Sequence, residues 1–127
     1  MAYTILIVDD DSSQLALCEI LLKRNSFAVL KATDSVHALS LLDSMTPDLI
    51  VLDYMMPDMN GFDLCKRIRN RPQTAGTPVI ILSAVQDTFG KPGSESIGAT
   101  AFISKLNQQK QLVPTINNIL QLVNTQM

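Results

Sequence analysis

Short apolar runs alternate along this chain with longer segments in which apolar residues recur every three or four positions. The runs predict buried strands and the segments between them predict amphipathic helices, a pattern typical of α/β sheet proteins. The first, third and fourth runs are apolar without alternation, as expected of central parallel strands that helices cover on both faces. The five expected strands are Tyr3–Val8, Phe27–Lys31, Asp48–Leu52, Pro78–Leu82 and Thr100–Ser104.

Four of the intervening segments have helical periodicity. Ser35 is expected to cap the second helix, Asn60 and Gly61 to open the third, and Pro114 to lie near the first turns of the last helix or to kink it. The residues expected to face the core are Leu17, Cys18, Leu21 and Leu22 in the first helix, Ala38, Leu39 and Leu42 in the second, Leu64, Cys65 and Ile68 in the third, and Leu112, Ile116, Ile119, Leu120 and Val123 in the last.

The segment between the fourth and fifth strands is a poor helix former. It contains Gly90, Pro92 and Gly93 where the α/β alternation requires a helix. We therefore expect a short or irregular fourth helix, irregular from about Asp87 to Gly93 with at most a turn near Ser94–Ile97.

Two sets of polar helix residues are interpreted as surface. Lys66, Arg67 and Arg69 of the third helix are expected to form a solvated face and not a binding patch. His37, the single histidine, lies in the polar part of the second helix and is expected to be exposed and without a catalytic role.

Length and composition bound the classes of function. The 127 residues, 46% of them hydrophobic, suit one domain spanning residues 1–127. Ten basic residues against twelve acidic ones give a net charge of -2 without a basic tract, so direct nucleic acid binding is not expected. No apolar run reaches the roughly 20 residues that span a bilayer, and we expect a cytoplasmic protein with no membrane partner. Cys18 and Cys65 lack metal-ligand spacing and are expected to be reduced and half-buried.

Polar residues gather at the carboxyl ends of the expected strands, where open α/β sheets place their ligand sites. Asp11, followed by two serines, is interpreted as a helix N-cap. The others are Asp9 and Asp10 after the first strand, Asp53 after the third, Ser83 after the fourth and Lys105 after the fifth.

Such a cluster of carboxylates raises its own pKa values unless a cation neutralises it. Mg²⁺ suits the site because it binds carboxylate and phosphate oxygens and keeps several waters. Lys105 and Ser83 could then cover the remaining oxygens of a phosphoryl group. The pattern predicts a phosphoryl-transfer site with an aspartate as the acceptor.

The motifs ILIVDDD, DLIVLDYMMPDMNGFDLCKRIR, TPVIILSA and GATAFISK resemble the receiver domain of two-component response regulators. The resemblance covers nearly the whole chain, in order and with matching spacing. It implies a flavodoxin-like (βα)₅ fold whose five parallel strands are ordered 2-1-3-4-5 with helices on both faces; this order comes from the family and not from the spacing of the runs.

The resemblance also implies roles for individual residues. Asp53 would be the phosphorylated aspartate, and Asp10 would bind Mg²⁺ directly together with Asp53 and the main-chain carbonyl of Met55, with Asp9 acting through water. Ser83 and Lys105 would bind phosphoryl oxygens. Phe102 occupies the aromatic switch position that responds when Ser83 moves, but it lacks the hydroxyl of the more frequent tyrosine.

We therefore expect a stand-alone phosphoacceptor that a histidine kinase or histidine phosphotransfer protein modifies and that controls a separate protein target. It would catalyse only its own phosphorylation and dephosphorylation and would not otherwise be an enzyme. Two alternatives stay open. One is a pseudo-receiver that binds partners without phosphorylation. The other is an aspartyl-phosphate hydrolase of the haloacid dehalogenase class, which normally has a second aspartate two positions after the nucleophile, where this chain has Met55.

Overall fold

The computed structural model of the chain describes residues 2–83 and 98–125, the side chains of 122–125 excepted. Its five strands form one parallel sheet in the order β2-β1-β3-β4-β5. This confirms the predicted strands, each of which begins and ends within one residue of the expected position, and the order that the resemblance implied. The strands are β1 (Thr4–Val8), β2 (Ala28–Ala32), β3 (Leu49–Asp53), β4 (Val79–Ser83) and β5 (Ala101–Ser104).

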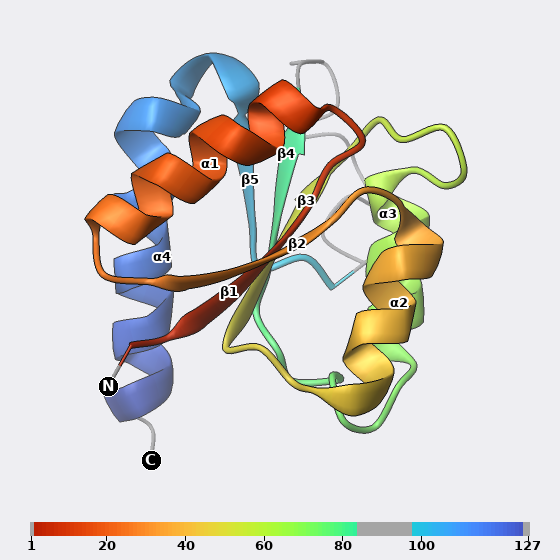
Figure 1. Cartoon of the computed structure of the whole chain (residues 1–127). Coiled ribbons are helices and arrows are strands. Elements are labelled where there is room, and N and C mark those ends of the chain that lie inside the picture. Colours follow the sequence, from red (N-terminus) through yellow and green to blue (C-terminus); the bar gives the residue numbers. More distant parts are fainter. Residues whose placement is uncertain (1, 84–97, 126–127) are drawn as a thin grey trace.

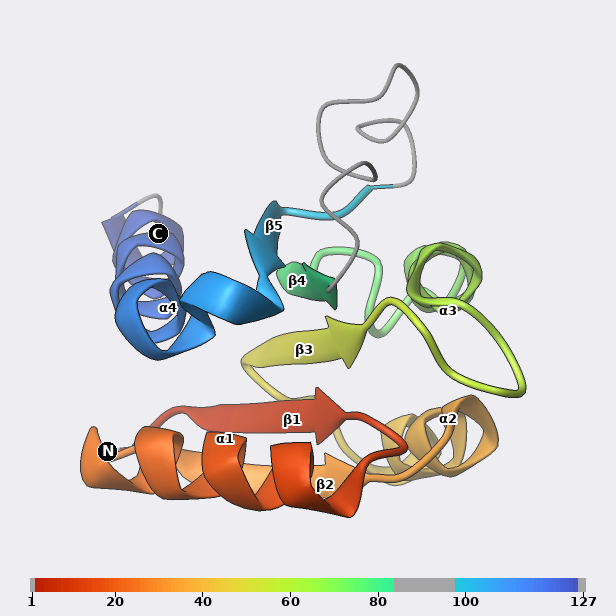
Figure 2. The same ribbon diagram turned by 90° about the horizontal axis from the view of Figure 1, so that it is seen from above.

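Helices cover both faces of the sheet. Figure 1 and Figure 2 show α1 and α4 on one face and α2 and α3 on the other. The helices are α1 (Ser12–Arg24), α2 (Ser35–Ser44), α3 (Gly61–Arg69) and α4 (Gln108–Thr125), and a single 3₁₀ turn, η3 (Lys105–Asn107), precedes α4. Within the described residues no helix is long and apolar enough to cross a membrane.

The core has two halves because the strands present alternate side chains to opposite faces of the sheet. Ile5 and Ile7 of β1 pack with α1 and α4, whereas Leu6 and Val8 pack with α2 and α3. All four are at most 2% exposed. Burial on both faces explains why the central strands are continuous apolar runs.

The buried face of the first helix differs from the expected one at Leu17. Leu15, Cys18 and Leu22 are buried, at spacings of three and four that match one side of a helix, and Leu21 is half-buried. Leu17 is 50% exposed, so the prediction that it faces the core was wrong. One residue step turns a helix by about 100°, which moves Leu17 away from the side that holds Cys18.

The start of α2 also differs from the expectation. Asp34, and not Ser35, is the N-cap, and its carboxylate accepts from the main-chain N–H of His37 at 2.7 Å. Ser35 is the first helical residue and is buried. The pattern failed here because aspartate and serine both cap helices, and only the main-chain conformation decides between neighbours.

Arg69 is not part of a solvated face. Its guanidinium donates to the main-chain carbonyls of Thr77 at 2.5 Å, Gly98 at 3.0 Å and Thr74 at 3.3 Å. It therefore joins the end of α3 to the start of β4 and the approach to β5. Lys66 and Arg67 are exposed as expected.

Most of the remaining predictions about side chains are confirmed where the structure describes them. His37 is exposed, and Pro114 lies in the second turn of α4. Cys18 and Cys65 are free, as expected, but the prediction that they are half-buried was wrong, because both are buried in the core. Burial raises the pKa of the Cys18 thiol to about 11. The expected core residues of α2, α3 and α4 are buried or half-buried, Val123 lying outside the described side chains. The predicted irregular segment between residues 87 and 97 lies outside the described residues.

Candidate functional site

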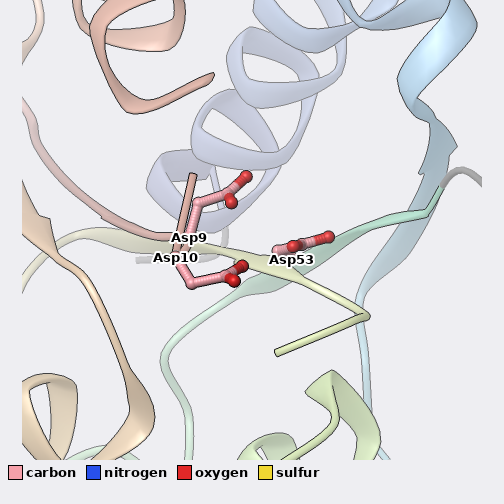
Figure 3. A group of neighbouring side chains, drawn as sticks. All are labelled: Asp9, Asp10 and Asp53. Carbon is pink, nitrogen blue, oxygen red and sulfur yellow. The ribbon is translucent and has the colours of Figure 1, made fainter. Parts of the chain in front are cut away.

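Three carboxylates meet at the ends of β1 and β3. These strands are neighbours, with Val8 opposite Leu52, so Asp9 and Asp53 occupy the next positions on adjacent strands. Asp9, Asp10 and Asp53 each bring an oxygen to within 4.8 Å of the others (Figure 3). Asp9 and Asp53 are 4% exposed, while Asp10 is exposed. The cluster offers three carboxylate oxygens and is open to solvent on the side of Asp10. Such a site suits a divalent cation such as Mg²⁺, which binds carboxylates and keeps several waters.

Lys105 joins this cluster from the end of β5. Its Nζ lies 3.0 Å from Oδ1 of Asp53 and 3.3 Å from Oδ2 of Asp9, and its side chain is 18% exposed. Burial by itself would lower the pKa of Lys105. The hydrogen bond and charge of Asp53, together with Asp9, outweigh burial and raise that pKa, so the ammonium stays charged between the two carboxylates.

The carboxyl group of Asp53 lies in an electrostatically unfavourable place when no cation is bound. Burial raises the pKa of Asp53, the hydrogen bond from Lys105 lowers it, and the charge of Asp9 raises it again, with a net upward shift. One ammonium therefore does not balance the three carboxylates. A divalent cation held by the same oxygens would supply the missing positive charge, so the residues present fit Mg²⁺.

The loop from Tyr54 to Asn60 lies beside Asp53. The main-chain N–H of Met55 lies 3.4 Å from Oδ1 of Asp53, which places the main chain of Met55 at the cluster, while its side chain is 60% exposed. The base of the loop is closed because the Gly61 N–H donates to the carbonyl of Tyr54 at 2.8 Å. Asn60 caps α3 by accepting from the N–H of Asp63 at 2.9 Å.

Ser83 and Phe102 occupy the neighbouring strands. Ser83 ends β4, is fully buried, and lies one residue beyond Leu82, which pairs with Asp53. Phe102 in β5 is half-buried, and its ring centroid lies 6.1 Å from that of Phe62. The structure thus places Ser83 at the same sheet edge as Asp53, and Phe102 within an aromatic group.

Asp11 stays out of the carboxylate cluster, as expected. Its Oδ1 accepts from the N–H groups of Ser13 at 2.9 Å and Gln14 at 3.3 Å, which makes it the N-cap of α1. The three consecutive aspartates therefore have different surroundings. Asp9 is buried against Lys105, Asp10 is exposed beside the possible cation site, and Asp11 caps a helix.

The contacts of two residues near the site, Gly61 and Asp58, were not predicted from the sequence. A Cβ on Gly61 would lie 2.9 Å from the main-chain oxygen of Asp53, so α3 can start this close to β3 only because Gly61 lacks a side chain. Asp58 Oδ2 accepts from both the N–H and the hydroxyl of Ser35. The glycine that follows Asn60 was a possible signal for the first, whereas nothing local indicated the second.

A groove of about 300 Å³ lies on another part of the surface, between α1 and the start of α4. Its lining contains both apolar and polar side chains and includes no carboxylate. The lining residues are Leu17, Cys18, Ile20, Leu21, Arg24, Gln108 and Gln109. The candidate chemistry therefore belongs to the strand ends and not to this groove.

The doubly covered parallel sheet with acidic strand ends defines a flavodoxin-like α/β domain. Residues 5–117 match the family described as the response regulator receiver domain, and the chain belongs to this family of two-component signalling. It is 27% identical to the chemotaxis response regulator CheY4 of Vibrio cholerae, with a TM-score of 0.86 over 94% of this chain and 99% of that one. These matches confirm the family and fold that the motifs implied.

Curated relatives include longer proteins. The DNA-binding response regulator MtrA of Mycobacterium tuberculosis is 34% identical over 116 residues, which are 91% of this chain and 50% of MtrA. The transcriptional regulatory protein CpxR of Klebsiella pneumoniae is 40% identical over 116 residues, 91% of this chain and 48% of CpxR. The chain spans about half the length of these curated relatives.

Proposed function

We propose that Asp53 accepts a phosphoryl group from a phosphohistidine of a partner protein in a Mg²⁺-dependent reaction, and that the phosphorylated chain controls a separate protein. The proposal rests mainly on the surroundings of Asp53. This residue is 4% exposed, its Oδ1 lies 3.0 Å from Nζ of Lys105, and the carboxylates of Asp9 and Asp10 lie beside it. Burial and the charge of the adjacent Asp9 raise its pKa, although Lys105 lowers it. Such a shift is expected of a carboxylate that binds a cation.

In this reaction a carboxylate oxygen of Asp53 attacks phosphorus. The bond between phosphorus and the histidine nitrogen breaks, and its electron pair stays on the imidazole. Asp10, Asp53 and the main-chain carbonyl of Met55 would hold Mg²⁺, with Asp9 acting through water, and the bound ion supplies positive charge to the phosphoryl oxygens. Lys105 stabilises one of these oxygens and Ser83 donates to another.

The proposed hydrogen bond from Ser83 to the phosphoryl group would also start a conformational change. Once Asp53 carries a phosphoryl group, the Ser83 hydroxyl moves toward it and Phe102 turns inward. Phe102 is half-buried, beside the ring of Phe62, so its movement would change the surface at the β5 edge of the sheet. A downstream protein that contacts this edge would then distinguish the two states.

Intact-protein mass spectrometry with acetyl phosphate tests the proposal. The parent chain with Mg²⁺ should gain one phosphoryl group, and EDTA should prevent the gain. Asp53→Asn should abolish it, whereas Asp63→Asn, which removes an exposed carboxylate from α3, should not. A stable 1:1 adduct on Asp53→Asn would contradict the assignment of the acceptor.

The two alternatives predict other outcomes. A pseudo-receiver would gain no phosphate from any donor. A haloacid dehalogenase-type hydrolase would turn over phosphate esters repeatedly, but the residue two positions after Asp53 is Met55, whose side chain has no carboxylate to act as the acid. The proposed chain performs only its own phosphorylation and dephosphorylation.

The proposed partners are a histidine kinase or histidine phosphotransfer protein upstream and a protein target downstream, with the reaction in the cytoplasm. MtrA is a DNA-binding response regulator, and this chain aligns with half of its length. The expectation of no direct nucleic acid contact therefore concerns these 127 residues only, whose net charge is -2.

A further inference from the structure

The loop of residues 54–60 reaches across to the start of α2. Oδ2 of Asp58 accepts the main-chain N–H of Ser35 at 3.0 Å and also a short hydrogen bond from the Ser35 hydroxyl. Ser35 is 1% exposed, so the carboxylate takes the place of water as its partner. This hydrogen bond from the hydroxyl also holds the pKa of Asp58 below its ordinary value.

Two carboxylates therefore accept hydrogen bonds from the first turn of α2, but only Asp58 belongs to the loop of residues 54–60. Asp34 precedes the helix and caps it through the His37 N–H at 2.7 Å. Asp58 is 24 positions further along the chain and ties the helix to the segment that follows β3. The two residues offer the same chemistry at the same helix end, with different attachments.

The position of Asp58 within the loop gives this contact its importance. Met56 is 9% exposed and packs in the core between the sheet, α2 and α3, and Asn60 caps α3. Between these two anchors, Asp58 accepts the hydrogen bonds that tie the loop to α2. The main chain of Met55, whose N–H lies 3.4 Å from Oδ1 of Asp53, belongs to the same short loop.

We propose that Asp58 is a positioning residue for the divalent cation: its hydrogen bonds to Ser35 fix the loop that presents the main-chain carbonyl of Met55 to the metal. The inference rests on the proposed function because that function includes Mg²⁺. Asp58 does not touch the ion and acts through the loop, so the affinity for Mg²⁺ depends on the start of α2. Outer groups that orient a metal ligand contribute to metal affinity in this way.

The test is a Mg²⁺ titration of the full chain, followed by amide NMR shifts, together with amide exchange of the loop in EDTA. Asp58→Ala should raise the Kd for Mg²⁺ roughly tenfold, the lower end for residues that orient a ligand. It should also speed exchange at residues 54–60 without metal. Ser35→Ala should shift both readings in the same direction, and the double variant should bind no more weakly than Asp58→Ala alone.

Asp34→Ala is the matched control because it removes a carboxylate and a cap from the same helix end without touching the loop. It should lower the stability of the fold yet leave the Kd for Mg²⁺ within about twofold of the parent value. Asp58→Asn keeps an acceptor oxygen for Ser35 and loses only the charge. Its affinity for Mg²⁺ should therefore lie between that of Asp58→Ala and that of the parent chain.

Unchanged affinity in Asp58→Ala would overturn the inference, as would an equal loss in Asp34→Ala. Equal losses in Asp58→Asn and Asp58→Ala would also overturn it, because they would assign the effect to charge and not to position. A parent chain that binds no Mg²⁺ would instead overturn the proposed function itself, so the two failures are distinguishable.

Discussion

Gly61 and Asp53 approach so closely that the first residue of α3 has no room for a side chain. A Cβ on Gly61 would lie 2.9 Å from the main-chain oxygen of Asp53 and 3.0 Å from Cα of Tyr54. Both neighbours are main chain, which cannot turn aside as a flexible side chain could. Because Gly61 has no Cβ, the loop of residues 54–60 can close within a few residues of Asp53.

Gly61→Ala should reduce the free energy of unfolding by about 1–3 kcal/mol, the usual effect of forcing an extra methyl group into a packed site. Denaturant unfolding in EDTA measures it. Gly76→Ala is the control because a Cβ there meets nothing within 4 Å, and it should change stability by less than about 0.5 kcal/mol. Equal effects of the two substitutions would show that the close approach is unimportant.

The acidic residues after β1 should differ in their effect on Mg²⁺. Asp10→Asn removes a charged ligand and should weaken binding by roughly 1–2 kcal/mol or more. Asp11→Asn keeps the oxygen that accepts from the N–H groups of Ser13 and Gln14, so it should leave both binding and stability nearly unchanged. A metal titration that gives equal losses for the two variants would mean that the ligand has been assigned to the wrong aspartate.

Neutralising the carboxylate of Asp53 should stabilise the metal-free fold at neutral pH. The pKa of Asp53 is raised, mainly by burial, so the folded state binds its proton more tightly than the unfolded chain does. Ionised Asp53 therefore destabilises the fold above its folded pKa, and that penalty disappears as the pH falls and the carboxyl is protonated. Lys105 keeps Asp9 as a partner in the variant.

Asp53→Asn in EDTA should accordingly be more stable than the parent at pH 7, with the difference narrowing as the pH is lowered. Urea unfolding at several pH values measures this, and Asp63→Asn controls for the loss of one negative charge. A variant less stable than the parent at pH 7, or a difference that grows on acidification, would contradict the assigned direction of the pKa shift.

Lys105 should matter most when no metal is bound. Lys105→Gln leaves the buried carboxylates of Asp9 and Asp53 without their cation, so the metal-free fold should lose about 1–3 kcal/mol. Mg²⁺ should restore more stability to this variant than it adds to the parent, because the ion then takes over the missing charge.

Lys31→Gln provides the comparison for this prediction. Lys31 also pairs with a carboxylate at 3.0 Å, that of Glu19, but its side chain is 46% exposed. Its loss should cost less than about 1 kcal/mol and should show no dependence on Mg²⁺. Thermal unfolding with and without MgCl₂ measures both variants, and an equal response to the ion would argue against a metal-linked role of Lys105.

The positions of the strands and the grouping of the side chains at their ends could be predicted from the sequence. Each strand lies within one residue of its expected bounds because a parallel strand covered on both faces must be a continuous apolar run. Asp9, Asp10, Asp53 and Lys105 could be grouped from the sequence because parallel strands bring their carboxyl ends to one edge. The strand order came from the resemblance to a family, since periodicity does not specify which strands are neighbours.

Contacts between elements that are distant in sequence could not be predicted and became visible in the folded chain. Leu17 fits an apolar pattern as well as Leu15 does, and the packing of α1 on the sheet leaves Leu17 exposed. Arg69 looked like a solvated charge, yet the carbonyls of Thr77 and Gly98 lie within its reach. The pairing of Asp58 with Ser35 likewise depends on the loop of residues 54–60 meeting the start of α2. Local propensity acts over a few residues, whereas these contacts depend on how the whole chain folds.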